Sequence, residues 1–262
     1  MKETMDSMQP HEQITAALNR AMRSGRVGLV PYITAGYPDK DRFIDTLRKV
    51  ASEADVVEVG VPFSDPMADG VTIQRASHAA IAAGVSLRWI LNELTLAGGI
   101  GAPVVLMSYL NPLLAFGYPE LANASIGAGV GGFIVPDLPI EEADEFRAAM
   151  DEAGIALIQL VTPATPDDRM VRLCAASRGF IYAVTIKGIT GGVSELPAGV
   201  SAYLDHVKAN SKIPVCAGFG VREAAQVKYL GGHADGVVVG SALVEQLEAG
   251  NDPADFLRSL KA

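Results

Sequence analysis

VVEVGVPFSDPMADG, residues 56–70, places a glutamate inside a run of Val and Gly that is typical of a fully buried parallel strand. Side chains alternate along a strand, so Val57, Val59 and Val61 share one face while Val56, Glu58 and Gly60 share the other. A carboxylate is rarely buried without a partner, and burial raises its pKa by disfavouring the charged form. Fold and chemistry therefore both depend on where Glu58 points.

Similar apolar runs recur along the chain and alternate with segments of helical character. The predicted strands cover residues 28–35, 55–61, 103–109, 132–136, 156–161, 180–185, 214–217 and 236–239. The predicted helices cover residues 40–54, 73–83, 87–97, 119–127, 141–153, 167–176, 198–209, 222–231 and 242–249. Gly or Pro stands at most of the junctions, as expected for turns.

Strict alternation of strand and helix predicts a parallel sheet with right-handed crossovers. Eight βα units over about 28–249, after an amphipathic helix at about 11–24, fit a single (β/α)8 TIM barrel domain in residues 1–262, since about 250 residues is typical of that fold. The alternative is an open doubly wound sheet, which normally carries GxGxxG after its first strand; the sequence there is AGYPDK.

The barrel predicts a position for Glu58. The face with Val57 meets the surrounding helices, so Glu58 points into the interior near the C-terminal mouth, where active sites of this fold lie. Gly60, one layer higher, leaves space above it. The following loop brings Asp69 towards the mouth, whereas Asp65 is interpreted as a turn residue. Two carboxylates in unlike environments can divide acid, base and orienting roles.

Glycine-rich segments after the last strands predict a phosphate site. The sequence AGFGV, residues 217–221, follows the seventh strand. The eighth strand ends in VVVGSALVE, residues 237–245. Gly218, Gly220 and Gly240 allow the backbone to approach an anion, and the Ser241 hydroxyl adds a donor. KGITGGVSELPAG, residues 187–199, has the composition of a mobile lid, whose Thr190 and Gly191 would add donors to the same phosphate.

Composition argues against several classes of partner. The chain has a net charge of −9 and no run of Lys or Arg, so neither nucleic acid nor an anionic membrane is expected to bind. No apolar stretch is long enough to span a membrane, and the polar N-terminus lacks a signal-peptide core, so a cytoplasmic location is expected. Cys174 and Cys216 have no metal-ligand spacing and are expected to be reduced, and the four His are scattered.

Several motifs together identify a resemblance. VEVGVPFSDPMADGVTIQ, residues 57–74, resembles the signature of the tryptophan synthase α subunit family. Further similar segments are VPYITAGYP (30–38), LMSYLNPLLAFG (106–117), FIVPDLPIEEA (133–143), TIKGITG (185–191), AGFGV and VVVGSALV. The likeness runs in order over about residues 27–248, and the spacing of Glu, FSDP and Asp is not a general feature of barrels.

The resemblance implies a lyase that cleaves indole-3-glycerol phosphate to indole and D-glyceraldehyde 3-phosphate in tryptophan biosynthesis. It implies that Glu58 is the acid/base and that Asp69 binds the indole N–H. It also implies substrate-binding and phosphate-binding sets. The substrate-binding set is Tyr32, Ile73, Tyr109, Tyr182, Thr190 and Phe219, and the phosphate-binding set is Gly191, Gly220, Gly240 and Ser241.

The resemblance further implies a partner, the tryptophan synthase β subunit, in an α2β2 complex. That partner would receive the indole and carry pyridoxal phosphate, while no cofactor or metal is expected in this chain. Three positions depart from the family pattern: Val71 stands where Pro is common, Tyr32 where Phe is also found, and Ile186–Lys187 where some relatives place an Arg.

Two alternative functions stay open at this point. In the first, Lys187 is the Schiff-base nucleophile of a covalent aldolase, although its polar, glycine-rich surroundings do not favour a lowered pKa. In the second, the barrel is a non-catalytic phosphate-binding activator of a partner enzyme, with the Pro, Leu and Phe side chains of the mouth loops as a docking surface.

Overall fold

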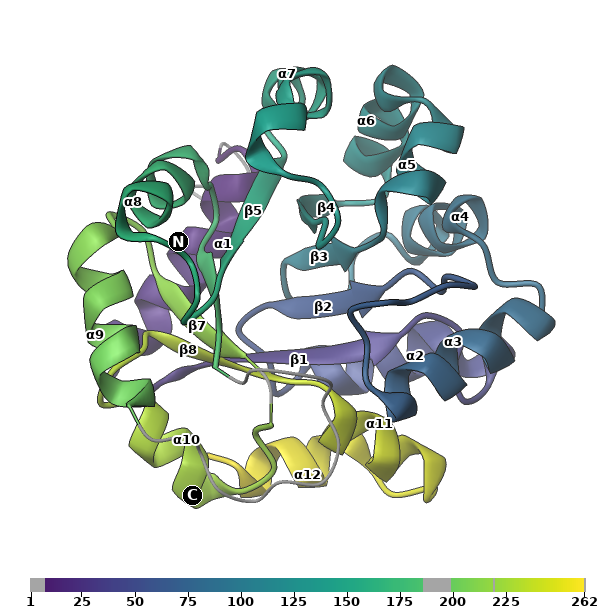
Figure 1. The fold of residues 1–262 in the computed structure, drawn as a ribbon. Helices are drawn as coiled ribbons and strands as arrows, with labels where there is room; N and C mark the ends of the chain where they lie inside the picture. Colours follow the sequence, from purple (N-terminus) through teal and green to yellow (C-terminus); the bar gives the residue numbers. More distant parts are fainter. Residues whose placement is uncertain (1–7, 186–198, 219, 262) are drawn as a thin grey trace.

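Eight parallel strands close a barrel in which each strand pairs with the next along the chain and β8 pairs with β1 (Figure 1). The expected TIM-barrel fold class is therefore confirmed. The computed structural model describes residues 8–185, 199–218 and 220–261. The strands are β1 Gly28–Thr34, β2 Val57–Gly60, β3 Val104–Met107, β4 Val130–Ile134, β5 Ala156–Val161, β6 Ile181–Val184, β7 Val215–Gly218 and β8 Gly236–Val239.

Helices surround the barrel (Figure 1). They are α1 Pro10–Arg23, η1 Lys40–Arg42, α2 Phe43–Ala51, α3 Val71–Ala82, α4 Leu87–Ala97, α5 Leu110–Phe116, α6 Tyr118–Gly127, η2 Ile140–Glu142, α7 Asp144–Glu152, α8 Asp167–Ala176, α9 Val200–Asn210, α10 Ala224–Leu230, α11 Ser241–Glu248 and α12 Pro253–Ser259. Among the described residues, none of these helices has the length and apolarity needed to cross a membrane.

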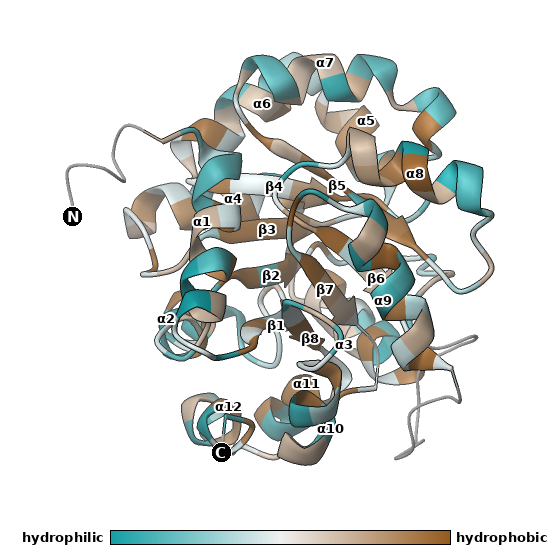
Figure 2. Ribbon diagram, turned by 90° about the vertical axis from the view of Figure 1, so that its left-hand side faces the viewer, coloured by the Kyte–Doolittle hydropathy of each residue, from teal (hydrophilic) through white to brown (hydrophobic). Residues whose placement is uncertain are grey.

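The alternation expected along β2 is confirmed. Val57, Val59 and Val61 belong to the large apolar cluster between strands and helices. Val56 belongs instead to the cluster that fills the barrel interior, which it shares with Val30 and other inward side chains. Figure 2 shows the result: apolar strands at the centre and hydrophilic surfaces on the outer faces of the helices.

Helix α1 closes the N-terminal end of the barrel. Ile14 and Leu18 are fully buried and pack in the interior cluster. A methyl group on Gly28, at the start of β1, would lie only 2.7 Å from a Leu18 methyl carbon, so the helix sits directly against the strand ends. With this end filled by side chains, the C-terminal mouth is the end left for a ligand.

Some element boundaries differ from expectation. No helix was predicted over residues 110–116, which form α5; Pro112 lies in its first turn, where no intrahelical N–H bond is needed. Helix α12 was also not expected; it begins after Asp252, whose side chain accepts a hydrogen bond from Ala254 N. The single helix expected over 40–54 is instead η1 followed by α2, which ends at Ala51.

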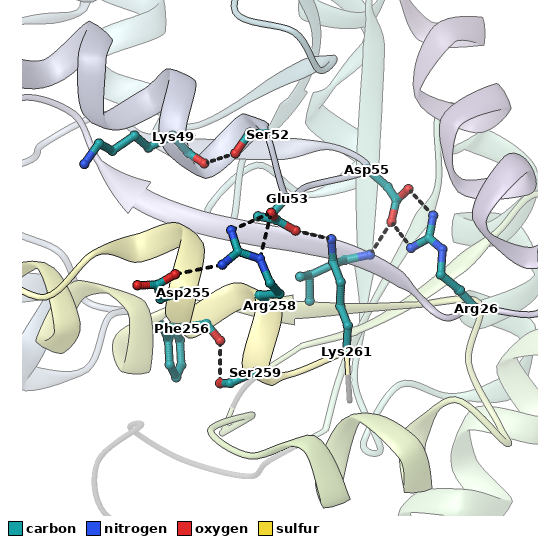
Figure 3. Close-up of polar contacts among 11 residues, drawn as sticks. Arg26, Lys49, Ser52, Glu53, Asp55, Asp255, Phe256, Arg258, Ser259 and Lys261 are labelled. Carbon is teal, nitrogen blue, oxygen red and sulfur yellow. Dashed lines mark hydrogen bonds and ion pairs between the residues drawn. The ribbon is translucent and has the colours of Figure 1, made fainter.

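The C-terminal helix α12 is held on the outside of the barrel by ion pairs (Figure 3). Glu53, just after α2, pairs with Arg258 at 3.1 Å and with Lys261 at 2.8 Å. These contacts lower the pKa of the Glu53 carboxyl, the hydrogen bond from Lys261 contributing most. They lie outside the barrel interior, so they support the fold without entering the mouth.

Candidate active site

Glu58 points into the barrel interior from β2. It is 1 % exposed, and its backbone neighbours across the sheet are Tyr32 on β1 and Val105 on β3. Its Oε2 atom makes no hydrogen bond, and no ion pair within the described part of the chain involves it. Burial first, and then the charge of Asp69, raise the pKa of Glu58 to about 8. Glu58 is therefore mainly protonated at neutral pH.

The space above Glu58 is not empty as expected, because Tyr32 fills it. A methyl group on Gly60 would lie 2.5 Å from Tyr32 Cζ, so the phenol ring lies across the glycine. The Tyr32 hydroxyl is 3.3 Å from Thr34 Oγ1. Burial, together with the charge of Asp69, raises the pKa of Tyr32 well above its ordinary value. At neutral pH Tyr32 thus presents a neutral phenol beside both carboxylates.

Tyr182 makes a similar arrangement on the other side of the interior. A methyl group on Gly218 of β7 would lie 2.6 Å from both Tyr182 Cζ and its hydroxyl. Burial raises the pKa of Tyr182, and the charge of Glu58 raises it further. The rings of Tyr32 and Tyr182 thus pack against glycines and reduce the access of water to Glu58. Both are neutral, so neither forms an ion pair with the Glu58 carboxylate.

Asp69 lies on the β2–α3 loop and is half-buried at the mouth. It accepts a hydrogen bond from the Tyr109 hydroxyl at 3.2 Å, and the same hydroxyl accepts one from Ala68 N at 2.8 Å. The Tyr109 ring stacks on Phe63 with 5.0 Å between centroids. Burial raises the pKa of Asp69 to about 6, opposed by the hydrogen bond from Tyr109. Asp69 is therefore mainly ionised at pH 7, with a pKa well below that of Glu58.

An apolar patch lies between these groups. Tyr32 and Ile73 pack in one small cluster with Val244 of α11, and Met107 packs against them. Ile73 comes from the first turn of α3, directly after the Asp69 loop. The carboxylates are thus bordered by a flat phenol and by branched side chains, surroundings that suit an aromatic ring.

Of the glycines expected at the phosphate end, Gly240 lies directly before α11 and Gly220 lies in the loop after β7. Gly240 precedes this helix, and no side chain caps the helix N-terminus, which begins at Ser241. A methyl group on Gly240 would meet only Tyr32 Cβ, at 3.9 Å. Gly220 has a φ of 85°, a conformation that favours glycine. The backbone N–H groups there are available to an anion within reach of the Tyr32 region.

The structure brings together seven of the predicted site residues from five parts of the chain. Of these, Glu58, Asp69, Tyr32, Ile73, Tyr109 and Tyr182 line the interior or mouth, and Gly240 adjoins Tyr32. Gly220 and Ser241 lie in the loops that follow β7 and β8. Thr190, Gly191, Phe219 and Lys187 lie outside the described residues.

Two mouth residues were missed by sequence reasoning. Thr34 is 1 % exposed and contacts the Tyr32 hydroxyl. Met107 pairs with Gly60 in the strand register and packs against Ile73. Both lie two residues from a predicted site residue on the same strand face, so extending the alternation from Tyr32 and from Tyr109 would have found them.

Within the described residues, no group of three or more His, Cys, Asp or Glu side chains is arranged so that it could bind a metal ion. The free, buried thiols of Cys174 and Cys216 agree with the expectation of reduced cysteines. The described residues offer instead a protonated carboxyl, an ionised carboxyl and an uncapped helix end around one mouth.

The chain is similar in sequence to proteins of one known family. The family described as "Tryptophan synthase alpha chain" matches residues 18–262. The tryptophan synthase alpha chain of Roseiflexus castenholzii is 42 % identical over 258 residues, which cover 95 % of this chain and 99 % of that protein. The corresponding protein of Nitratidesulfovibrio vulgaris is 41 % identical over 244 residues, covering 92 % and 95 %.

Solved structures agree with these relatives. A chain of tryptophan synthase from M. tuberculosis, in an aminoacrylate-bound form, superposes with a TM-score of 0.86 at 35 % identity and covers 95 % of this chain and 98 % of that one. Tryptophan synthase subunit alpha from Legionella pneumophila superposes with a TM-score of 0.84 at 33 % identity, covering 95 % and 97 %.

Proposed function

The chain belongs to the tryptophan synthase alpha chain family, and on that premise we propose that Glu58 and Asp69 carry the family's lyase reaction in this protein. The reaction is the retro-aldol cleavage of indole-3-glycerol phosphate to indole and D-glyceraldehyde 3-phosphate, in tryptophan biosynthesis. The observation that carries the residue assignment is the buried Glu58 carboxyl, whose Oε2 has no hydrogen-bond partner among the described residues and whose pKa is raised to about 8.

Glu58 supplies and recovers the proton. Its protonated carboxyl donates to C3 of the indole, which gives the ring a positive charge. The resulting carboxylate then accepts the proton of the glycerol hydroxyl next to C3. As that O–H pair forms the aldehyde carbonyl, the carbon–carbon bond breaks and its electrons return to the ring. A carboxyl with a pKa near the working pH performs both transfers well, and Glu58 ends in its starting state.

Asp69 stabilises the charge that develops on the indole. When C3 is protonated, positive charge grows on the ring nitrogen, and an ionised carboxylate that accepts the N–H bond lowers the energy of that state. With a pKa of about 6, Asp69 is roughly 90 % ionised at pH 7. Tyr109 holds the carboxylate in place through its hydroxyl. Tyr32, Ile73 and Tyr182 would border the indole ring.

The phosphate end holds the substrate for this chemistry. The uncapped N-terminus of α11 at Ser241, with Gly220 and Gly240, would bind the phosphate through backbone N–H groups. Binding at this end lets the phosphate restrain the reacting bond beside Glu58. The contributions of Thr190, Gly191 and Phe219 stay predictions.

We also propose that the partner is the tryptophan synthase β subunit in an α2β2 complex, with pyridoxal phosphate carried only by that partner. Large apolar side chains are exposed around the mouth: Met67 is 82 % exposed, Val71 65 % and Leu114 58 %. Such groups support a docking surface for a protein that receives indole. We propose that the reaction in this chain needs no cofactor, and the cytoplasmic location stays a prediction.

The test is indole release from indole-3-glycerol phosphate by the full chain, with and without a β subunit. Glu58→Gln is expected to lower kcat by about 10² to 10⁴, the usual contribution of general acid–base catalysis, with substrate binding largely kept. Glu53→Gln is the matched control, since it makes the same chemical change outside the barrel interior and is expected to keep kcat. Retention of more than about one hundredth of kcat by Glu58→Gln would contradict the assignment.

The same assay separates the two alternatives. A non-catalytic activator would release no indole in either condition. A Schiff-base aldolase would be trapped covalently by borohydride in the presence of a carbonyl substrate, and Lys187→Met would prevent trapping. The proposed reaction predicts indole release without any borohydride-trapped adduct.

A further inference from the structure

Three segments of the barrel mouth meet at one carboxylate, that of Glu245. This residue lies on α11 one turn after Ser241. Its carboxylate accepts a hydrogen bond from Thr72 Oγ1 at 3.3 Å and forms an ion pair with the Arg222 guanidinium. Thr72 lies three residues after Asp69, and Arg222 lies two residues after Gly220. Glu245 thus joins the Asp69 loop to both glycine-rich loops.

We propose that Glu245 is a positioning residue, which fixes the distance between the phosphate-binding loops and the Asp69 loop by holding Arg222 and Thr72 at once. The inference rests on the proposed function, because it assigns a role to the spacing between the phosphate and the reacting carbons. In this role Glu245 acts through Arg222 and Thr72, its two partners.

On one side, Thr72 moves together with Asp69. Helix α3 begins at Val71, so Thr72 is in its first turn. In the same turn the side-chain amide of Gln74 donates a hydrogen bond to the Asp69 carbonyl at 2.9 Å. The Asp69 backbone is therefore attached to the start of α3, and a restraint on Thr72 is transmitted to Asp69. Helices α3 and α11 lie side by side (Figure 1).

On the other side, Arg222 moves together with the loop after β7. The side-chain oxygen of Gln226 accepts hydrogen bonds from Arg222 N at 2.7 Å and from Glu223 N at 3.1 Å. The backbone around Arg222 is therefore fixed to the start of α10, while its guanidinium reaches α11. Since α11 itself begins at the Gly240–Ser241 end, Glu245 restrains both predicted phosphate loops relative to each other.

The sizes of the effects on stability and on rate distinguish a positioning role of Glu245 from a purely stabilising one. The Arg222 and Glu245 side chains are 35 % and 37 % exposed, so their ion pair contributes little to folding. A small displacement of a reacting group, by contrast, can reduce a rate by a large factor. A positioning role therefore predicts a loss of kcat/KM that exceeds the loss of stability.

The next turn of α11 offers a matched control. Glu248 forms an ion pair with Arg75 at 2.6 Å and accepts a hydrogen bond from Tyr37 at 2.7 Å. Glu248 lies on the same helix as Glu245, has the same carboxylate and also forms an ion pair with an arginine. It reaches α3 one turn further from Asp69, and within the described residues its ion pair and hydrogen bonds do not involve the loops after β7 or β8.

The experiment compares Glu245→Ala, Glu245→Gln and Glu248→Ala in the full chain. It measures kcat, KM and kcat/KM for indole release, together with thermal stability. Glu245→Ala is expected to lower kcat/KM by about tenfold, and Glu248→Ala by less than about threefold despite an equal or larger fall in Tm. Glu245→Gln keeps an acceptor for Thr72 and is expected to recover part of the loss. Equal effects of the two alanine variants would overturn the inference.

A double-mutant cycle tests the shared role directly. Thr72→Val and Arg222→Ala are each expected to lower kcat/KM in the wild-type background and to have no further effect in Glu245→Ala. Full retention of both effects in Glu245→Ala would overturn the positioning role alone. Absence of indole release by the wild-type chain with a β subunit would instead overturn the proposed function, and this inference with it.

Discussion

Replacing Glu58 by Gln should make the protein more stable at alkaline pH while removing its activity. Glutamine keeps the size of the side chain but does not titrate. In the wild type, the Glu58 pKa is about 8 in the folded state against 4.5 for an exposed carboxyl. Between these two values the folded chain binds more protons at this group than the unfolded chain, so raising the pH lowers the free energy of unfolding.

The magnitude follows from the two pKa values. The term that Glu58 subtracts from the wild-type free energy of unfolding grows by about 3.5 kcal/mol between pH 5 and pH 8. The Glu58→Gln variant lacks this term. Its free energy of unfolding relative to wild type should therefore rise by about that amount over the same interval, because the other titrating groups contribute similarly to both proteins.

Urea unfolding of both proteins at pH 5, 6.5 and 8, at constant ionic strength, measures this difference. Glu53→Gln is the control whose difference from wild type should stay nearly constant from pH 5 to pH 8, because ion pairs lower the Glu53 pKa. Its stabilising contribution is present above the unfolded pKa of 4.5 and is lost as the pH falls through the lower folded value. A Glu58→Gln difference that stays constant within about 1 kcal/mol from pH 5 to pH 8 would refute a raised Glu58 pKa.

The remaining predictions concern the mouth. The value of kcat/KM should fall above about pH 8, because Glu58 then loses its proton. The alkaline limb of the pH profile is the diagnostic one, since the substrate phosphate also titrates near pH 6 and affects the acid limb. A kcat/KM that is constant from pH 7 to 9.5 would contradict this prediction. Tyr109→Phe removes the hydrogen bond that lowers the Asp69 pKa. The acid limb of the kcat/KM profile should therefore move to higher pH, and kcat/KM at pH 6.5 should fall. An acid limb that does not move would show that Tyr109 does not act on Asp69. Gly60→Ala should lower the free energy of unfolding in urea by about 1–3 kcal/mol because its methyl group overlaps the Tyr32 ring, and the same substitution should cost less in a Tyr32→Ala background; a Gly60→Ala variant as stable as wild type would contradict the packing.

The barrel and the direction of Glu58 could be predicted because both follow from periodicity. Strict alternation along residues 56–61 places Val57 and Val59 against helices, and regular spacing of apolar runs gives the βα units. The boundaries were less predictable. No helix was predicted over residues 110–116, although Pro112 in the first turn of α5 is compatible with a helix.

The details of the mouth depend on contacts between distant segments, which sequence spacing does not contain. Gly60 suggested an empty space over Glu58, whereas the ring of Tyr32, from the neighbouring strand, fills it. The sequence also did not show that Asp69 is partly buried and bonded to the Tyr109 hydroxyl; burial raises its pKa to about 6, and the hydrogen bond opposes that shift. Nothing in the spacing of Thr72, Arg222 and Glu245 indicated that they meet.

A direct measurement of the protonation state of Glu58 tests the central claim. Carbon-13 NMR of the glutamate side-chain carboxyls would follow each resonance with pH, and the Glu58 signal is the one absent from Glu58→Gln. The buried carboxyl, whose Oε2 has no hydrogen-bond partner in the described part of the chain, predicts a titration midpoint near 8. A midpoint near 4.5, the value of an exposed glutamate, would contradict the account of Glu58 as a proton donor at neutral pH.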